Sequence, residues 1–215
     1  VLLHTRQGIY RAAPPFENWE NIYSTSDSTP INAVSVVGEK PIVLVGLADG
    51  QILKSEGFGE TWESVKGADM DGRGVTGFTP FENGTGILAF TTGNGVWRSG
   101  ATGSEWSRDN IGLAATSPTS VTSRSDETFV MGTDSGLYQA VPGETTPEWQ
   151  RLNSRFITAV ESPSKSNRLW AGTSTGAILR FEDGQSQKYS VNSNKDIGPF
   201  SMALAGSYKS GAIAS

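Results

Sequence analysis

An all-β fold built from repeated four-stranded antiparallel units is predicted by three observations. One phrase recurs five times: a glycine, an apolar residue, an aromatic residue or leucine, and a basic or amide residue, followed later by an aromatic ring. The rings are spaced 43, 44, 43 and 40 residues apart. No segment of about ten or more residues shows helical periodicity. A period in the forties is typical of propeller blades, because one such unit cannot bury its own apolar face.

The five copies define the repeated unit. Each phrase begins at one of five glycines: Gly8, Gly50, Gly95, Gly136 and Gly176. The rings that follow are Trp19, Trp62, Trp106, Trp149 and, in the last copy, Tyr189 in the tryptophan place. We interpret each period as one blade of a β-propeller of about five blades. A β-solenoid is the alternative, although solenoid coils are usually nearer 20–30 residues.

Each period divides into four short strand-like runs bounded by turn residues. In the clearest copy the runs are 157–161, 168–173, 177–181 and 188–191. The second strands of three earlier copies are expected at 42–47, 86–91 and 128–133. The first strands align on a small polar residue that precedes an apolar pair: Asn32, Thr76, Thr119, Thr158 and Ser201.

The unbroken repeat predicts a single propeller domain over 1–215. The expected repeats cover approximately 1–40, 41–85, 86–127, 128–167 and 168–211. Residues 200–204 match a first strand and 212–215 the start of a second strand, while the sequence begins within a second strand. Two arrangements fit this position of the two ends within the repeat. One is a ring of five blades closed by a clasp between the termini, and the other is a window of a six- or seven-bladed ring.

The composition narrows the possible functions. The net charge of −5 disfavours a nucleic-acid-binding protein, because no basic stripe is present to meet phosphates. The sequence has no cysteine, which excludes disulfides and thiolate metal sites. No apolar run is long enough for a transmembrane helix, and no signal peptide is evident. The compartment is not predicted.

The repeated residues have expected structural roles. The tryptophans are expected to pack between neighbouring blades. The glycines before the third strand supply the positive φ of tight turns, as in Asp49-Gly50, Asn94-Gly95 and Ser135-Gly136. A basic series on the third strands is expected to be solvated or to pair with carboxylates between blades: Arg11, Lys54, Arg98 and Arg180.

No catalytic, metal or cofactor site is predicted. His4 is the single histidine, so a site with two histidine ligands is impossible and a serine triad would have to use it. The run Asp69-Met70-Asp71-Gly72 has too few oxygen ligands in sequence for a calcium loop. A carboxylate pair for glycoside hydrolysis could come from different blades, but no specific pair stands out.

The segment Ser55-Glu56-Gly57-Phe58-Gly59-Glu60-Thr61-Trp62 resembles the Asp-box, or bacterial neuraminidase repeat, whose pattern is Ser/Thr-x-Asp-x-Gly-x-Thr-Trp. Residues 99–106 match it more weakly, and 162–173 resemble the linker and second strand of that family. The resemblance implies a propeller in which the box is a structural turn. The family's Asp is Gly57 in one copy and Ala101 in the other, so the turn is expected to rely on its glycine and tryptophan.

Proteins that carry the Asp-box include sialidases, some glucan hydrolases, sortilin-type receptors and photosystem assembly factors. The arginine-containing stretch of sialidases is not found in this sequence. A second similarity covers one module: 10–15 together with Asn18 and Trp19 are similar to five-bladed tachylectin-type lectins.

The loops between second and third strands are expected to gather on one face of the ring. The candidate partner-binding residues there are Arg6, Asp49, Asn94, Asp134 and Thr175. Such faces commonly bind partners or ligands. We therefore predict a non-catalytic propeller that binds another protein as a scaffold. A carbohydrate-binding propeller, or a degenerate glycosidase relative, is the alternative, and an active glycoside hydrolase is the least favoured.

Overall fold

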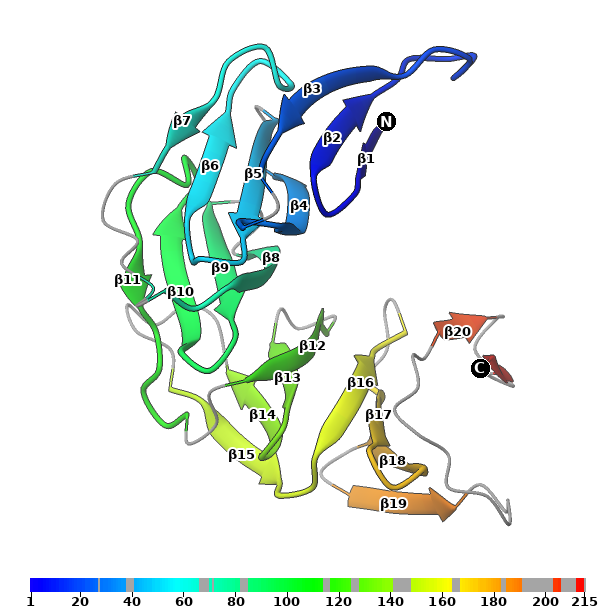
Figure 1. Ribbon diagram of the computed structural model, residues 1–215. Coiled ribbons are helices and arrows are strands. Elements are labelled where there is room, and N and C mark those ends of the chain that lie inside the picture. The colour runs from blue at the N-terminus through cyan, green and yellow to red at the C-terminus, as the bar shows by residue number, and fades with distance from the viewer. Residues whose placement is uncertain are drawn as a thin grey trace. The chain divides into compact units, whose positions relative to one another are not determined.

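The computed structural model consists of β-strands joined by turns (Figure 1). It describes residues 1–26, 28–37, 41–65, 70, 72–81, 85–113, 117–124, 128–140, 148–163, 167–182, 185–190, 203–205 and 212–214. No helix in these ranges is long and apolar enough to cross a lipid bilayer. The chain divides into two compact units, Val1–Asp109 and Asn110–Ser215. The prediction of a single domain over 1–215 therefore stays a prediction, while the prediction of an all-β fold is confirmed.

The first unit contains three antiparallel sheets whose strands follow chain order. The first sheet has three strands: β1 (Leu2–His4), β2 (Gly8–Arg11) and β3 (Glu20–Ser24). The second sheet has four: β4 (Ile31–Val37), β5 (Ile42–Leu47), β6 (Ile52–Ser55) and β7 (Glu63–Ser64). The third sheet also has four: β8 (Val75–Phe81), β9 (Gly86–Thr91), β10 (Gly95–Gly100) and β11 (Ser107–Arg108).

The second unit contains two four-stranded sheets and a strand pair. The fourth sheet comprises β12 (Pro118–Ser123), β13 (Phe129–Thr133), β14 (Gly136–Ala140) and β15 (Gln150–Asn153). The fifth comprises β16 (Ile157–Glu161), β17 (Leu169–Thr173), β18 (Ala177–Glu182) and β19 (Gln185–Ser190). The pair is β20 (Ala203–Ala205) with β21 (Ala212–Ala214).

The predicted strands lie within a few residues of the observed ones. The run 157–161 is strand β16 as expected, and the second strands at 42–47 and 86–91 are β5 and β9. In the arrangement closed by a clasp, the first strand of the fifth repeat, predicted at 200–204, would pair with the first sheet. Among the described residues, β20 pairs with β21 and β1 pairs with β2.

The small polar residue shared by the first strands is the site of a β-bulge. The pairing register skips it in each four-stranded sheet, for example from Ile31 to Ala33 and from Val75 to Gly77. The skipped residues are Asn32, Thr76, Thr119 and Thr158. A bulge leaves one residue out of the ladder and bends the strand, and a short polar side chain can bond locally there. The equivalent Ser201 lies outside the described residues.

The core of the first unit lies between neighbouring sheets. Strands β5 and β9 are buried along all six of their residues, which explains why their sequences do not alternate between polar and apolar. Leu44 and Ile52 of the second sheet share one apolar cluster with Val75 of the third. A side-chain carbon at Gly46 would lie 2.6 Å from the Val75 Cβ, so close sheet packing requires glycine there.

The four tryptophans of the repeat directly precede the outermost strands of their sheets: Trp19, Trp62, Trp106 and Trp149. Trp149 and Trp106 are buried, and Trp106 belongs to the cluster between the second and third sheets. The Trp62 indole N–H donates to the carbonyl of Ile22 at 2.9 Å, and its ring packs on Tyr23 of the preceding sheet at 5.4 Å. A ring at this position therefore bridges neighbouring sheets.

Tyr189 does not occupy the tryptophan place. In the other sheets the tryptophan directly precedes a residue of the outermost strand that pairs with a fixed position on the neighbouring strand. Trp62, for example, precedes Glu63, which pairs with Lys54. Arg180 pairs with Gln187, so Ser186 holds the equivalent position. Tyr189 lies three residues later and is exposed. The spacing of the aromatic residues predicted the wrong residue for this position. The reason is that β19 begins sooner after β18 than the outermost strands of the other sheets begin after their neighbours.

The glycines before the third strand have two different explanations. Gly50 and Gly95 have φ values of +90° and +74°, as predicted for tight turns. Gly136 does not have a positive φ. There a Cβ would lie 2.4 Å from the carbonyl oxygen of Asn153, so close backbone approach, not turn conformation, requires glycine.

Candidate functional site

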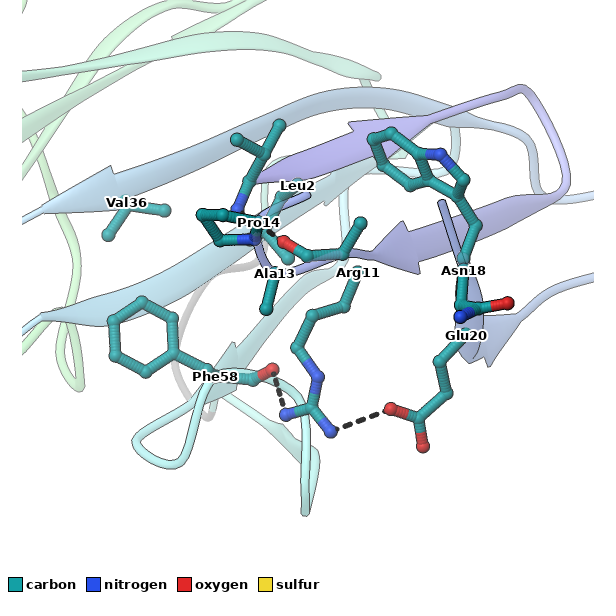
Figure 2. Close-up of a pocket in the computed structure, with 11 residues that line it drawn as sticks. Leu2, Arg11, Ala13, Pro14, Asn18, Glu20, Val36 and Phe58 are labelled. Atoms are coloured by element: carbon teal, nitrogen blue, oxygen red, sulfur yellow. Dashed lines mark hydrogen bonds and ion pairs between the residues drawn. The ribbon is translucent and has the colours of Figure 1, made fainter. Parts of the chain in front are cut away.

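A cavity of about 610 Å³ lies between the first sheet and the second (Figure 2). It is formed by the start of β1, the end of β2, the start of β3, one residue of β4 and the turn between β6 and β7. Its lining comprises Val1, Leu2, Arg11, Ala12, Ala13, Pro14, Asn18, Trp19, Glu20, Val36 and Phe58. All of these residues belong to the first unit.

The segment between β2 and β3 forms one wall of the cavity. Two consecutive prolines, Pro14 and Pro15, end the pairing of β2 because proline has no N–H to donate. Phe16 then adopts a positive φ of 67°, and its N–H donates to the carbonyl of Ala13 at 2.7 Å. This turn reverses the chain and brings Asn18 and Trp19 to the cavity.

The box-like turn of the second sheet forms the facing wall. The Ser55 hydroxyl accepts a hydrogen bond from the Gly59 N–H at 2.8 Å, across the turn that contains Gly57. A Cβ on Gly59 would lie 2.3 Å from Ile22 Cδ1, so this turn packs tightly on the first sheet. Phe58 has a φ of 53°, and its ring lies beside the cavity (Figure 2).

Arg11 links the two walls. Its guanidinium donates to Glu20 Oε2 at 2.8 Å and to the carbonyl oxygen of Phe58 at 3.2 Å (Figure 2). Glu20 lies directly across from it on β3. The Arg11 side chain remains 33% exposed, so it is accessible from the cavity.

The rim of the cavity combines exposed apolar side chains with acidic ones. Trp19 and Phe58 are each 44% exposed, and Val1 and Val36 are more so. Large apolar side chains gathered around a hollow mark an interaction site more often than scattered ones do. Exposed glutamates lie in the same turns and at the start of the following strands: Glu17, Glu20, Glu56, Glu60 and Glu63.

Lys54 occupies the position of Arg11 one module later, and its surroundings are closed. Its ammonium lies 3.0 Å from Glu56 and from Glu63 and donates to the Ser104 hydroxyl in the turn between β10 and β11. Only 5% of its side chain is exposed. Desolvation lowers the pKa of Lys54, but the hydrogen bonds to Glu63 and Glu56 outweigh it, so the pKa is raised overall.

The basic series therefore pairs differently from the prediction. The carboxylate partners of Arg11, Lys54 and Arg180 lie within their own sheets, at Glu20, at Glu56 and Glu63, and at Glu182. The contacts of Arg11 and Lys54 with the next sheet go to a carbonyl and a hydroxyl instead. Cross-strand register explains the pairs with Glu20 and Glu63, because the outermost strand places these carboxylates directly opposite the cations.

Two other carboxyl groups have perturbed titration. Burial raises the pKa of Asp109, and the nearby charge of Arg98 offsets part of that shift. Burial also raises the pKa of Glu161 at the end of β16. Neither residue lines the cavity.

The five residues predicted for a partner face lie elsewhere. Arg6 lies in the turn between β1 and β2 of the first sheet, and the other four lie in turns between the second and third strands of the four-stranded sheets: Asp49, Asn94, Asp134 and Thr175. The cavity lies at the other end of β2, where this strand leaves the first sheet. Arg6 lines a separate hollow of about 430 Å³ with Thr5, Gln7 and Pro30. Asp49 accepts a hydrogen bond from the Gln51 N–H at 3.0 Å, and Thr175 lies 3.1 Å from the Thr173 hydroxyl.

The cavity residues were not among the predicted site residues, although a signal existed. The similarity to tachylectin-type lectins covered 10–15, Asn18 and Trp19, which include six lining residues. Phe58 and Val36 gave no such signal, because their part in the site depends on how the second sheet packs against the first.

Within the described ranges, no group of three or more histidine, cysteine or acidic side chains could hold a metal ion. His4 is exposed on β1. Asp69 and Asp71 lie outside the described residues.

Comparisons with known proteins show the fold. No family model and no curated protein matches the sequence. Virginiamycin B lyase from Staphylococcus aureus is similar in structure, with a TM-score of 0.73 at 12% identity over 94% of this chain and 68% of that chain. YCF48 from Cyanidioschyzon merolae has a TM-score of 0.64 at 13% identity over 93% and 70%. A chain of the Mitotic Checkpoint Complex has a TM-score of 0.67 at 15% identity over 86% and 60%.

These neighbours are β-propellers, and the chain has the β-propeller fold. It spans only 60% of the Mitotic Checkpoint Complex chain and 28% of an extracellular domain from B. thetaiotaomicron. At such identities the likeness concerns the fold and not the activity.

Proposed function

We propose that this chain is a non-catalytic propeller module that binds a protein partner through the cavity of the first sheet. The observation that carries the proposal is the cavity itself, a hollow of about 610 Å³ with half-exposed Trp19 and Phe58 at its walls. Aromatic anchors in pockets supply most of the energy of protein interfaces, and tryptophan and arginine are enriched among them. Trp19 and Arg11 both line this cavity.

The chemistry of the lining favours binding over catalysis. The guanidinium of Arg11 is already held by Glu20 and by the Phe58 carbonyl. A general acid or base must be within hydrogen-bond reach of the reacting group and have a pKa suited to the transfer. Glu20 is exposed and engaged by Arg11, and most other lining side chains are apolar. Propellers also occur within assemblies, since one similar chain belongs to a structure named Mitotic Checkpoint Complex.

A randomised dodecapeptide display library tests the proposal. The immobilised bait is the full chain, and the matched bait is the double variant Trp19→Ala, Phe58→Ala. We expect the chain to enrich peptides that the double variant fails to retain. Thermal unfolding of both baits checks that the variant stays folded. Enrichment of the same peptides by both baits, or of none by either, would contradict binding at this cavity.

Carbohydrate binding is the second candidate function. The half-exposed Trp19 ring lies in the same cavity as the Asn18 amide and the Glu20 carboxylate, a combination that can stack on a sugar and bond its hydroxyls. A glycan array probed with the chain and with Trp19→Ala tests it. Glycans retained by the chain and lost by the variant would favour this function over the first, whereas an array without retained glycans would exclude it for the glycans displayed.

A further inference from the structure

We infer that the partner recognised at this cavity is a basic peptide segment in which a large apolar residue is flanked by lysine or arginine. The inference rests on the proposed function and adds the chemistry of the partner. Its basis is the combination of an apolar hollow and a rim that carries negative charge.

The hollow fits an apolar anchor. Its walls include Leu2, Pro14, Val36 and Phe58 as well as Trp19. A groove with mostly apolar walls gains little from a polar side chain, but buries an apolar one favourably. The volume of about 610 Å³ falls within the range of about 300–1,000 Å³ that is usual for ligand sites.

The rim is acidic because its turns carry exposed glutamates. Glu17 precedes the lining residue Asn18, and Glu60 lies two residues after Phe58 in the facing turn. Glu20 lines the cavity and its side chain is 65% exposed. Glu56 and Glu63 do not add to this rim, because both pair with Lys54, whose ammonium faces Ser104 of the third sheet.

The nearby cations do not cancel this charge for an incoming ligand. Lys54 is buried behind the turn and faces Glu56, Glu63 and Ser104, away from solvent. Arg11 is paired with Glu20. Beyond the Arg11–Glu20 ion pair, the turns around the cavity carry the exposed glutamates Glu17 and Glu60, and one ammonium group, that of Val1, which donates to the Ala12 carbonyl at 2.8 Å. A surface of this sign attracts basic partners and repels acidic ones.

Aromatic side chains at the rim strengthen the same preference. A lysine or arginine side chain close to the face of an aromatic ring gains a cation–π attraction. Trp19 and Phe58 are the rings exposed at this cavity, and the carboxylate of Glu20 shares its lining. A basic residue beside the anchor would therefore meet both a ring and a carboxylate.

The composition of selected peptides tests the inference. In the display selection, peptides lost with the double variant Trp19→Ala, Phe58→Ala should carry lysine or arginine within three positions of a large apolar residue. The strongest peptide is then titrated calorimetrically against the chain and against the variant Glu17→Gln, Glu60→Gln. We expect about fivefold weaker binding to that variant and a smaller salt dependence, because two rim charges are removed.

The matched control carries the same number of substitutions away from the cavity, Glu105→Gln and Asp134→Asn, and should bind like the unmodified chain. Cavity-dependent peptides without a basic bias, or equal binding to both double variants, would overturn the inference while leaving the proposed function standing. Selection of peptides that do not need the cavity would overturn both.

Discussion

The first and second sheets place the same chemistry at the same position and expose it to different degrees. Arg11 on β2 and Lys54 on β6 both lie on the strand next to the outermost one. Each pairs with a glutamate on the outermost strand and reaches a turn of the next sheet. Lys54 is 5% exposed, whereas Arg11 is 33% exposed and faces a cavity. The comparison teaches that the repeated residues are structural where the next turn covers them and available to a ligand where it does not.

The tryptophans allow the largest test of this comparison. Trp106 is 7% exposed within the core between two sheets, and Trp106→Ala should destabilise the protein by about 3–5 kcal/mol. Trp19 is half-exposed, and Trp19→Ala should cost less than about 1 kcal/mol. Urea unfolding of both variants measures the difference. Similar losses would mean that Trp19 is as structural as Trp106.

The cations provide a second test. Lys54→Ala removes a buried ammonium, and we expect a loss of about 2 kcal/mol, below the ~3–5 of a fully buried pair because its glutamates remain in water. Arg11→Ala breaks an exposed pair and should cost about 0.5–1 kcal/mol. The free energies of unfolding of the two variants decide. A larger loss for Arg11→Ala would reverse the comparison.

The box-like turns provide a smaller effect. The Ser55 hydroxyl accepts the Gly59 N–H, so Ser55→Ala should cost about 1 kcal/mol. Ser99 holds the same place in the third sheet, where its buried hydroxyl has no hydrogen-bond partner among the described residues. Ser99→Ala should therefore change stability by less than about 0.5 kcal/mol. Chemical denaturation separates the two, and equal losses would show that the hydroxyls act alike.

The smallest expected effect concerns pH. Burial raises the pKa of Asp109 above its ordinary value of 3.8, so the folded state favours the protonated carboxyl. The folded state therefore loses stability as pH rises from below 3.8 through the raised pKa, because the charged form is penalised. Asp109→Asn removes this dependence, and its stability relative to the unmodified chain should rise over that interval. Urea unfolding at a series of pH values checks the sign, and a parallel pH dependence of the two proteins would contradict it.

Local sequence signals predicted the fold well. Turn residues and a period near 43 can be read from the sequence alone, so the predicted runs lie close to the observed strands β5, β9, β13, β16, β17 and β18. The shared small polar residue of the first strands was recognised by its spacing, but its role as a bulge required the register of the neighbouring strand. Tyr189 was misplaced because the last turn breaks the spacing that the other copies keep.

The site was harder to predict because exposure depends on packing between sheets. The cation and the tryptophan recur in several modules, and the repeated phrase by itself does not show that Arg11 is exposed while Lys54 is buried. What differs is the turn that covers each of them. The resemblance to the Asp-box implied a turn that relies on its glycine and tryptophan, and the structure adds a hydrogen bond from the Gly59 N–H to the Ser55 hydroxyl.

The most direct test of the central claim is the binding of the strongest selected peptide to Arg11→Ala and to Lys54→Ala, measured side by side by calorimetry. Both variants should remain folded at the assay temperature, as checked by thermal unfolding. The account predicts about fivefold tighter binding of a basic peptide to Arg11→Ala, a gain of about 1 kcal/mol, because the Glu20 carboxylate in the lining loses its own cation, and unchanged binding to Lys54→Ala. Equal affinities for the two variants, or a loss confined to Lys54→Ala, would contradict it.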